Sequence, residues 1–198
     1  MNKLIIVITA QRHASTRLCE FLKINLVNFN IVRELFNYSH FPENIEKKPI
    51  KVIENKLLEH QNFGFKLFHN NMPKENVIEI IDKFKDRLLI IFLKRPLEDS
   101  YKSLCKSLTT GNWGTTPELQ LQWEKDNREG YQSVLPNFQE YKNTINNWFA
   151  SVYSICRTHN INTIININFD DVINQESLNK IKIEILNKLD IIDKDAFL

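Results

Sequence analysis

Uninterrupted apolar runs alternate with amphipathic segments along this chain. Residues 4–9 and 88–93 are short apolar runs, read as LIIVIT and LLIIFL. Such runs are typical of parallel strands that are covered on both faces of a sheet. Two more strands are predicted at residues 63–68 and 163–167, and a short edge strand at residues 29–35.

Segments with apolar residues at helical spacing lie between these strands. In residues 14–27, for example, Leu18, Phe21 and Leu22 share one helical face. Further helices are predicted at residues 45–60, 74–84, 97–108, 116–127, 141–158 and 177–189. Strands that alternate with helices predict an α/β fold, a three-layer sandwich with a mostly parallel central sheet of four to five strands flanked by helices.

Composition narrows the class of protein. The 198 residues are 42% hydrophobic, which fits a single domain over residues 1–198 with its own core. A net charge of +2 gives no case for nucleic-acid binding or a polybasic membrane anchor. No apolar run approaches the roughly 18 residues of a membrane span, and the short apolar start lacks a signal-peptide cleavage site. The three cysteines are isolated, without metal-ligand spacing, so we expect a cytoplasmic protein that binds no metal.

The turn after the first strand, TAQRHASTRL at residues 9–18, carries the clearest chemistry. Ligands of parallel α/β sheets lie beyond the carboxyl ends of the strands. The N–H groups and the dipole at a helix start favour an anion there. Arg12 adds a planar cation, Ser15 and Thr16 add hydroxyls, and His13 can donate a further hydrogen bond. The turn therefore predicts an anion-binding loop in the position of a P-loop.

This loop is not of the ATP- or GTP-binding type. A Walker loop reads GxxxxGK[ST], and residues 9–18 contain no glycine and no lysine at the helix start. No magnesium-binding aspartate follows an apolar strand, because the strand at residues 88–93 is followed by Lys94 and Arg95. The pattern predicts a P-loop-like sandwich that holds its anion without a metal.

Two motifs resemble the sulfotransferases that use 3′-phosphoadenosine 5′-phosphosulfate (PAPS). RHAST at residues 12–16 is similar to their Arg-Ser-Gly-Ser-Thr loop, which binds the 5′ end of the donor. FLKRPLEDSYKS places Arg95 before Pro96 and eight residues before Ser103, like their 3′-phosphate signature. The resemblance implies a donor site built from Arg12, His13, Ala14, Ser15, Thr16, Arg17, Arg95, Ser103 and Trp113.

Other segments resemble bacterial carbohydrate sulfotransferases of the trehalose and nodulation-factor type. They are VRELF with Glu34, FGFKLFHNN at residues 63–71, TGNW at residues 110–113, and NFDDVIN at residues 168–174, which is similar to a segment of their last strand. The similarity thus runs through most of the chain in the expected order. Ala14 departs from it, because the family has a glycine there and alanine is strained at a positive φ. The basic, glycine-rich C-terminal element of animal cytosolic sulfotransferases is also absent.

The resemblance implies sulfuryl transfer from PAPS to a hydroxyl of a small molecule or carbohydrate. Arg12 would stabilise the leaving phosphate, and Glu34 would accept the proton of the acceptor. His69 is the second candidate base, because KLFH at residues 66–69 is similar to a Lys-Thr-His motif of cytosolic sulfotransferases. Trp113 would stack on adenine or on an acceptor sugar, unless it is a hydrophobic plug under its loop.

Two alternatives remain open at the level of the sequence. One is a P-loop kinase-like phosphotransferase, and the missing Walker lysine and magnesium carboxylate count against it. The other is a nucleotide-binding module that has lost catalysis, which Ala14 in the loop favours. The identity of the acceptor and the oligomeric state are not specified by the sequence.

Overall fold

The protein is described from a computed structural model, over residues 2–36, 48–110 and 137–190. Five strands form one sheet in the order β2-β3-β1-β4-β5, and every pair of neighbours is parallel. The strands are β1 Leu4–Ile8, β2 Phe29–Val32, β3 Asn62–Leu67, β4 Leu88–Lys94 and β5 Ile164–Asn168. The predicted α/β class is confirmed, and the predicted short edge strand is β2.

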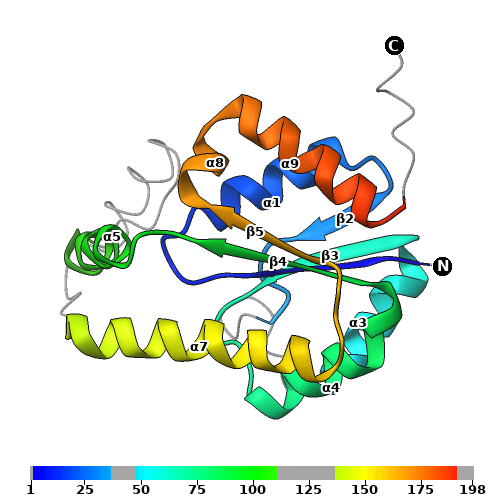
Figure 1. Cartoon of the computed structure of the whole chain (residues 1–198), viewed down its shortest axis with the longest axis horizontal. Helices are drawn as coiled ribbons and strands as arrows, with labels where there is room; N and C mark the ends of the chain where they lie inside the picture. The colour runs from blue at the N-terminus through cyan, green and yellow to red at the C-terminus, as the bar shows by residue number, and fades with distance from the viewer. Residues whose placement is uncertain (1, 37–47, 111–136, 191–198) are drawn as a thin grey trace.

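Helices cover both faces of the sheet (Figure 1). One face packs against α1 Ser15–Asn25, α8 Phe169–Ile173 and α9 Gln175–Lys188, and the other against α3 Pro49–Glu59, α4 Lys74–Phe84 and α7 Phe138–Thr158. Helix α5 Leu97–Thr110 lies beyond the carboxyl end of β4, and a short 3₁₀ turn spans Lys85–Arg87. In β1, Leu4, Ile6 and Ile8 face one core while Ile5 and Val7 face the other. Burial on both faces is the reason why this strand reads as an uninterrupted apolar run.

Several observed boundaries differ by a few residues from the predicted ones, and two of these differences have a local reason. The predicted helix at residues 141–158 begins earlier, at Phe138, because the Asn137 side chain accepts a hydrogen bond from the Gln139 N–H. The apolar pattern predicts a last strand that ends at residue 167, while the family resemblance likens residues 168–174 to part of that strand. Instead β5 ends at Asn168 and α8 follows, since Asn168 and Asp171 form a capping box. The predicted helix at residues 116–127 lies outside the described residues.

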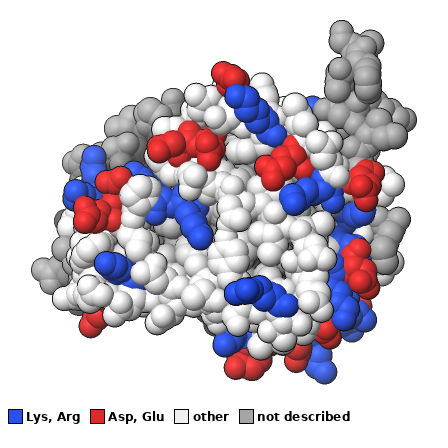
Figure 2. Space-filling view, viewed as in Figure 1, with Lys and Arg blue, Asp and Glu red and all other residues white. Residues whose placement is uncertain are grey.

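The parallel register sets the position of the turns. Ile8 of β1 lies beside Leu67 of β3 and Phe92 of β4, so the segments that follow these strands meet at one edge of the sheet. Basic and acidic side chains are interspersed on the face seen in Figure 2, without a large patch of one sign. None of the helices in the described parts of the chain is both long and apolar enough to span a membrane.

Candidate anion-binding site

The loop between β1 and α1 has an unusual backbone. Arg12 and Ala14 both adopt the left-handed conformation, with φ of 66° and 61°. Ala14 directly precedes α1 as its N-cap residue and has no side chain that can cap the helix. The glycine that the sequence lacks would therefore be the unstrained residue at this position.

Ala14→Gly is expected to raise the free energy of unfolding by about 1 kcal/mol. The reason is that glycine adopts the positive φ at residue 14 without strain, and this outweighs the larger entropy of the unfolded glycine chain. Chemical denaturation measures the change. The matched control is Ala150→Gly in α7, which should destabilise the protein by a similar amount, since Ala150 lies in a helix interior. A loss of stability in Ala14→Gly would contradict the strain at this position.

Two hydrogen bonds from neighbouring elements hold the loop. The indole Nε1 of Trp148, on α7, donates to the carbonyl of Thr9 at 3.3 Å. The imidazole of His13 is buried, and its Nδ1 lies 3.2 Å from the carbonyl oxygen of Leu93 in β4. Because a carbonyl only accepts, Nδ1 carries the hydrogen and the Nε2 atom of His13 has none. His13 therefore fixes the loop rather than offering its Nδ1 hydrogen to a ligand.

The pH dependence of stability should report the buried His13. Burial, and secondarily the charge of Arg95, lower the pKa of His13 to about 4, against the opposing hydrogen bond to Leu93. In the unfolded chain His13 binds a proton near pH 6.5. Its contribution to the free energy of unfolding is therefore fully present above this pH and is lost as the pH falls towards 4. The slope is at most about 1.4 kcal/mol per pH unit. Denaturation of the wild type and of His13→Asn, which can still donate to Leu93, should show a smaller slope in the variant. Equal slopes would contradict this role of His13.

Three predicted site residues form one hydrogen-bonded cluster. The Nε of Arg12 donates to Oγ of Ser103 in α5 at 3.0 Å. Nη1 of Arg95, which follows β4, donates to the backbone carbonyl of Arg12 at 2.9 Å. The guanidinium of Arg95 also lies over the ring of Phe169, 4.1 Å from its centroid. The sequence motifs around Arg12 and Arg95 thus meet in space, with Arg12 connecting Arg95 to Ser103.

This cluster carries positive charge that none of the described carboxylates pairs with. In the described part of the chain no Asp or Glu forms an ion pair with Arg12 or Arg95. Burial, followed by the charge of Arg95, lowers the pKa of Arg12. Nε of Arg95 is buried and has no hydrogen-bond partner among these residues. Two half-buried guanidinium groups without a counter-ion among the described residues favour the binding of an anion.

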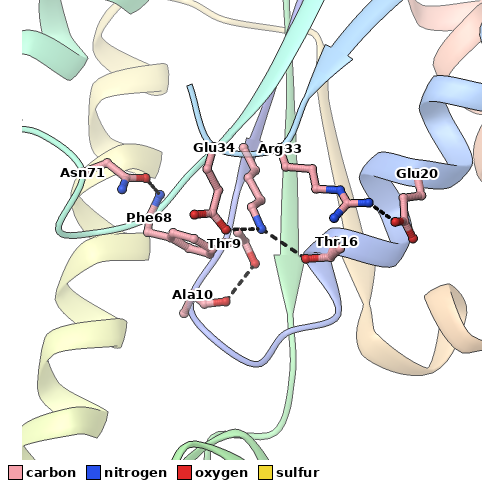
Figure 3. A network of polar contacts seen from close by, with 9 residues as sticks. Thr9, Ala10, Thr16, Glu20, Arg33, Glu34, Phe68 and Asn71 are labelled. Atoms are coloured by element: carbon pink, nitrogen blue, oxygen red, sulfur yellow. Dashed lines mark hydrogen bonds and ion pairs between the residues drawn. The ribbon is translucent and has the colours of Figure 1, made fainter. Parts of the chain in front are cut away.

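A second charged group reaches the start of α1 from β3. Lys66 is buried, with an exposed fraction of 2%. Its Nζ lies 2.8 Å from Oε1 of Glu34 and donates to Oγ1 of Thr16 at 3.2 Å. Figure 3 shows Glu34 and Thr16 pointing towards this one nitrogen from the end of β2 and from α1. The ammonium also lies 4.9 Å from the centroid of the Phe68 ring.

Lys66 is not among the site residues predicted from the sequence. The available signal was the position of a lysine within FGFKLF, a strand that is otherwise apolar. A lysine is almost never fully buried unless it is paired, so such a position indicates a nearby carboxylate or ligand. The register of β1 and β3, which places Lys66 beside Val7, brings the side chain to the anion-binding loop.

The remaining predicted residues are more dispersed. Ser15 is buried as the first residue of α1. Arg17 is exposed and donates to the carbonyl of Ile173 in α8, away from the cluster. His69, after β3, is partly buried, and this burial lowers its pKa; its Nδ1 has no partner among the described residues. Trp113 and most of the TGNW loop lie outside the described residues. Within the described residues, no group of three or more His, Cys, Asp or Glu side chains has the arrangement of a metal site.

Comparison with known proteins identifies the fold. No family model matches the chain, and no curated protein sequence matches it. Among solved structures, a sulfotransferase from Alicyclobacillus acidocaldarius is similar with a TM-score of 0.61 at 12% identity, over 97% of this chain and 82% of that one. The YorR protein of Bacillus subtilis, in complex with phosphorylated GDP, is similar with a TM-score of 0.51 at 14% identity, over 95% and 96% of the two chains. At these identities the comparisons show a P-loop-like fold and no more.

Proposed function

We propose that the protein is a sulfotransferase that moves a sulfuryl group from PAPS to a hydroxyl of a small molecule or carbohydrate. The observation that carries the proposal is the cluster of Arg12, Arg95 and Ser103. It joins two sequence motifs, since Arg12 lies 83 residues before Arg95 and 91 residues before Ser103. None of the described carboxylates neutralises it. The fold similarity to a bacterial sulfotransferase supports the same class of transferase.

In this proposal the donor lies across the carboxyl edge of β1 and β4. Arg12, Ser15, Thr16 and the N–H groups at the start of α1 bind the 5′-phosphosulfate. Arg95 and Ser103 bind the 3′-phosphate, so Ser103 exchanges its bond to Arg12 for one to the ligand. His13 and Ala14 shape the loop. Arg17 and Trp113 are also proposed to contact the donor.

The reaction is an in-line displacement at sulfur. The acceptor oxygen forms a bond to sulfur while the bond from sulfur to the bridging phosphate oxygen breaks. Negative charge develops on the leaving phosphate, where Arg12 and the loop N–H groups stabilise it. The acceptor proton passes to Glu34, or to His69 if Glu34 does not act as the base. The products are a sulfate ester and adenosine 3′,5′-bisphosphate.

A P-loop kinase-like phosphotransferase is the second candidate. Lys66 favours it, since its ammonium lies 3.2 Å from Thr16 at the helix start and supplies there the lysine that the loop itself lacks. A nucleotide-binding module without catalysis is the third, and it is favoured by the strained Ala14 in the loop.

Transfer assays separate the three candidates. The purified chain is incubated with ³⁵S-labelled PAPS and a panel of sugars, phenols and hydroxylated small molecules, and in parallel with γ-labelled ATP and magnesium. The proposal predicts labelled sulfate ester and release of bisphosphate from at least one acceptor. Label transfer from ATP alone would favour the kinase-like alternative. Bisphosphate binding without transfer to any acceptor would favour the inactive module.

Arg95→Ala is expected to weaken the binding of adenosine 3′,5′-bisphosphate by more than about tenfold, because a charged hydrogen bond to the 3′-phosphate is lost. Isothermal titration measures the affinity. Arg87→Ala is a matched control, since the Arg87 guanidinium also lies over a phenylalanine ring but at the opposite end of β4. Unchanged affinity in Arg95→Ala would remove the second motif from the proposal.

A further inference from the structure

Lys66 is a charged residue in the interior of the sheet. Its side chain is 2% exposed, and the ion pair with Glu34 at 2.8 Å compensates its charge. Removing an ammonium from water costs several kcal/mol unless a partner of opposite charge is present. The ammonium therefore needs an anion next to it in every state of the site.

The same nitrogen lies where a bound anion would be placed. Thr16 is the second residue of α1, and its hydroxyl oxygen is 3.2 Å from Nζ of Lys66. The first turn of a helix attracts negative charge. An ammonium has three hydrogens, so it can contact the hydroxyl and one or two anions together. Lys66 thus stands between the carboxylate of Glu34 and the proposed position of the 5′-phosphosulfate.

On the side of Glu34, the neighbouring Arg33 is already compensated and the neighbouring Cys19 is neutral. Arg33, next to Glu34, forms an ion pair with Glu20 of α1. Burial raises the pKa of the Cys19 thiol to about 12, so this neighbour is neutral. An arriving anion at the start of α1 therefore meets Lys66 as the cation whose partner it can replace.

We propose that Lys66 exchanges partners during the reaction: it pairs with Glu34 in the empty site and turns to the donor when the 5′ end is occupied. This deepens the proposed function and rests on it. A cation beside a carboxylate holds it in the charged form, and its departure makes the carboxylate a better proton acceptor. Glu34 would accordingly accept a proton more readily when the donor is bound than in the empty site. Lys66 is then both a donor contact and a positioning residue for Glu34.

The exchange predicts a competition that titration with adenosine 3′,5′-bisphosphate can measure. Glu34→Gln should bind the bisphosphate about tenfold more tightly than the wild type, because Lys66 is released to the ligand. Glu20→Gln removes the same charge from the neighbouring helix α1 and should change affinity by less than about twofold, since Glu20 pairs with Arg33 and not with Lys66. Lys66→Met should weaken binding about tenfold or more. In the Lys66→Met background, Glu34→Gln should act no more strongly than Glu20→Gln.

The outcomes are distinct. Weaker or unchanged binding of the bisphosphate in Glu34→Gln overturns the exchange. A tenfold gain in affinity that Glu34→Gln also causes in the Lys66→Met background overturns it too, because repulsion between Glu34 and the ligand would then explain the gain. If Lys66→Met alone does not fold, the Lys66→Met/Glu34→Gln variant leaves neither charge of this pair unpaired and is compared with Glu34→Gln. Binding that is then less than tenfold weaker in the double variant overturns the contact between Lys66 and the ligand. Failure of the wild type to bind the bisphosphate overturns the proposed function itself.

Discussion

Arg12→Ala is expected to lower the turnover of sulfuryl transfer by about 10²–10³-fold, the usual effect of removing one preorganised donor to a developing oxyanion. Arg95 holds the backbone of Arg12 in place by its hydrogen bond to the Arg12 carbonyl, and the Arg12 side chain can turn to the donor once Ser103 contacts the 3′-phosphate. Single-turnover measurements with labelled PAPS at saturating donor separate this effect from donor binding. Arg12→Lys should recover little activity, because an ammonium lacks the planar pair of donors that a guanidinium presents.

Arg157→Ala is the control for this experiment. Arg157 is exposed in the last turn of α7, and its removal should leave turnover within about twofold of the wild type. Turnover of Arg12→Ala within tenfold of the wild type would show that the loop does not stabilise the leaving phosphate. The reaction would then need another source of positive charge.

Glu34→Gln is expected to reduce turnover by about 10²–10⁴-fold while the bisphosphate still binds, because the amide cannot accept the proton of the acceptor. The comparison variant is His69→Ala, measured with the same acceptor and donor. His69 is a reasonable rival, since burial lowers its pKa and favours the neutral, proton-accepting form. Activity that survives in Glu34→Gln and is lost in His69→Ala would move the role of base to His69.

The central strands were predictable because their burial on both faces is visible in the sequence as apolar runs. β1 and β4 are buried on both faces, so their apolar runs are uninterrupted. Helix α8 was harder to predict, because the polar and apolar residues of NFDDVIN at 168–174 follow no clear period. The start of α8 depends on two side-chain hydrogen bonds between Asn168 and Asp171. Such local capping competes with strand propensity and is decided by geometry.

The sequence indicates candidate site residues but not the contacts between them. The motifs around Arg12 and Arg95 are visible in the sequence, and both follow strands that end at the same edge of the sheet. The position of Arg12 between Arg95 and Ser103 depends on the positive φ of Arg12 and Ala14, which residue type alone does not indicate. The participation of Lys66 depends on the register of β1 and β3, two strands that are far apart in the sequence.

The central claim is that one site, formed by the loop after β1 and by Arg95 with Ser103, binds a nucleotide that is phosphorylated at both its 3′ and 5′ positions. Isothermal titration of the wild type with adenosine 3′,5′-bisphosphate, without divalent cations, and separately with ATP and magnesium tests it directly. We expect tight binding of the bisphosphate and no comparable binding of ATP. Tight binding of ATP with magnesium and none of the bisphosphate would contradict it.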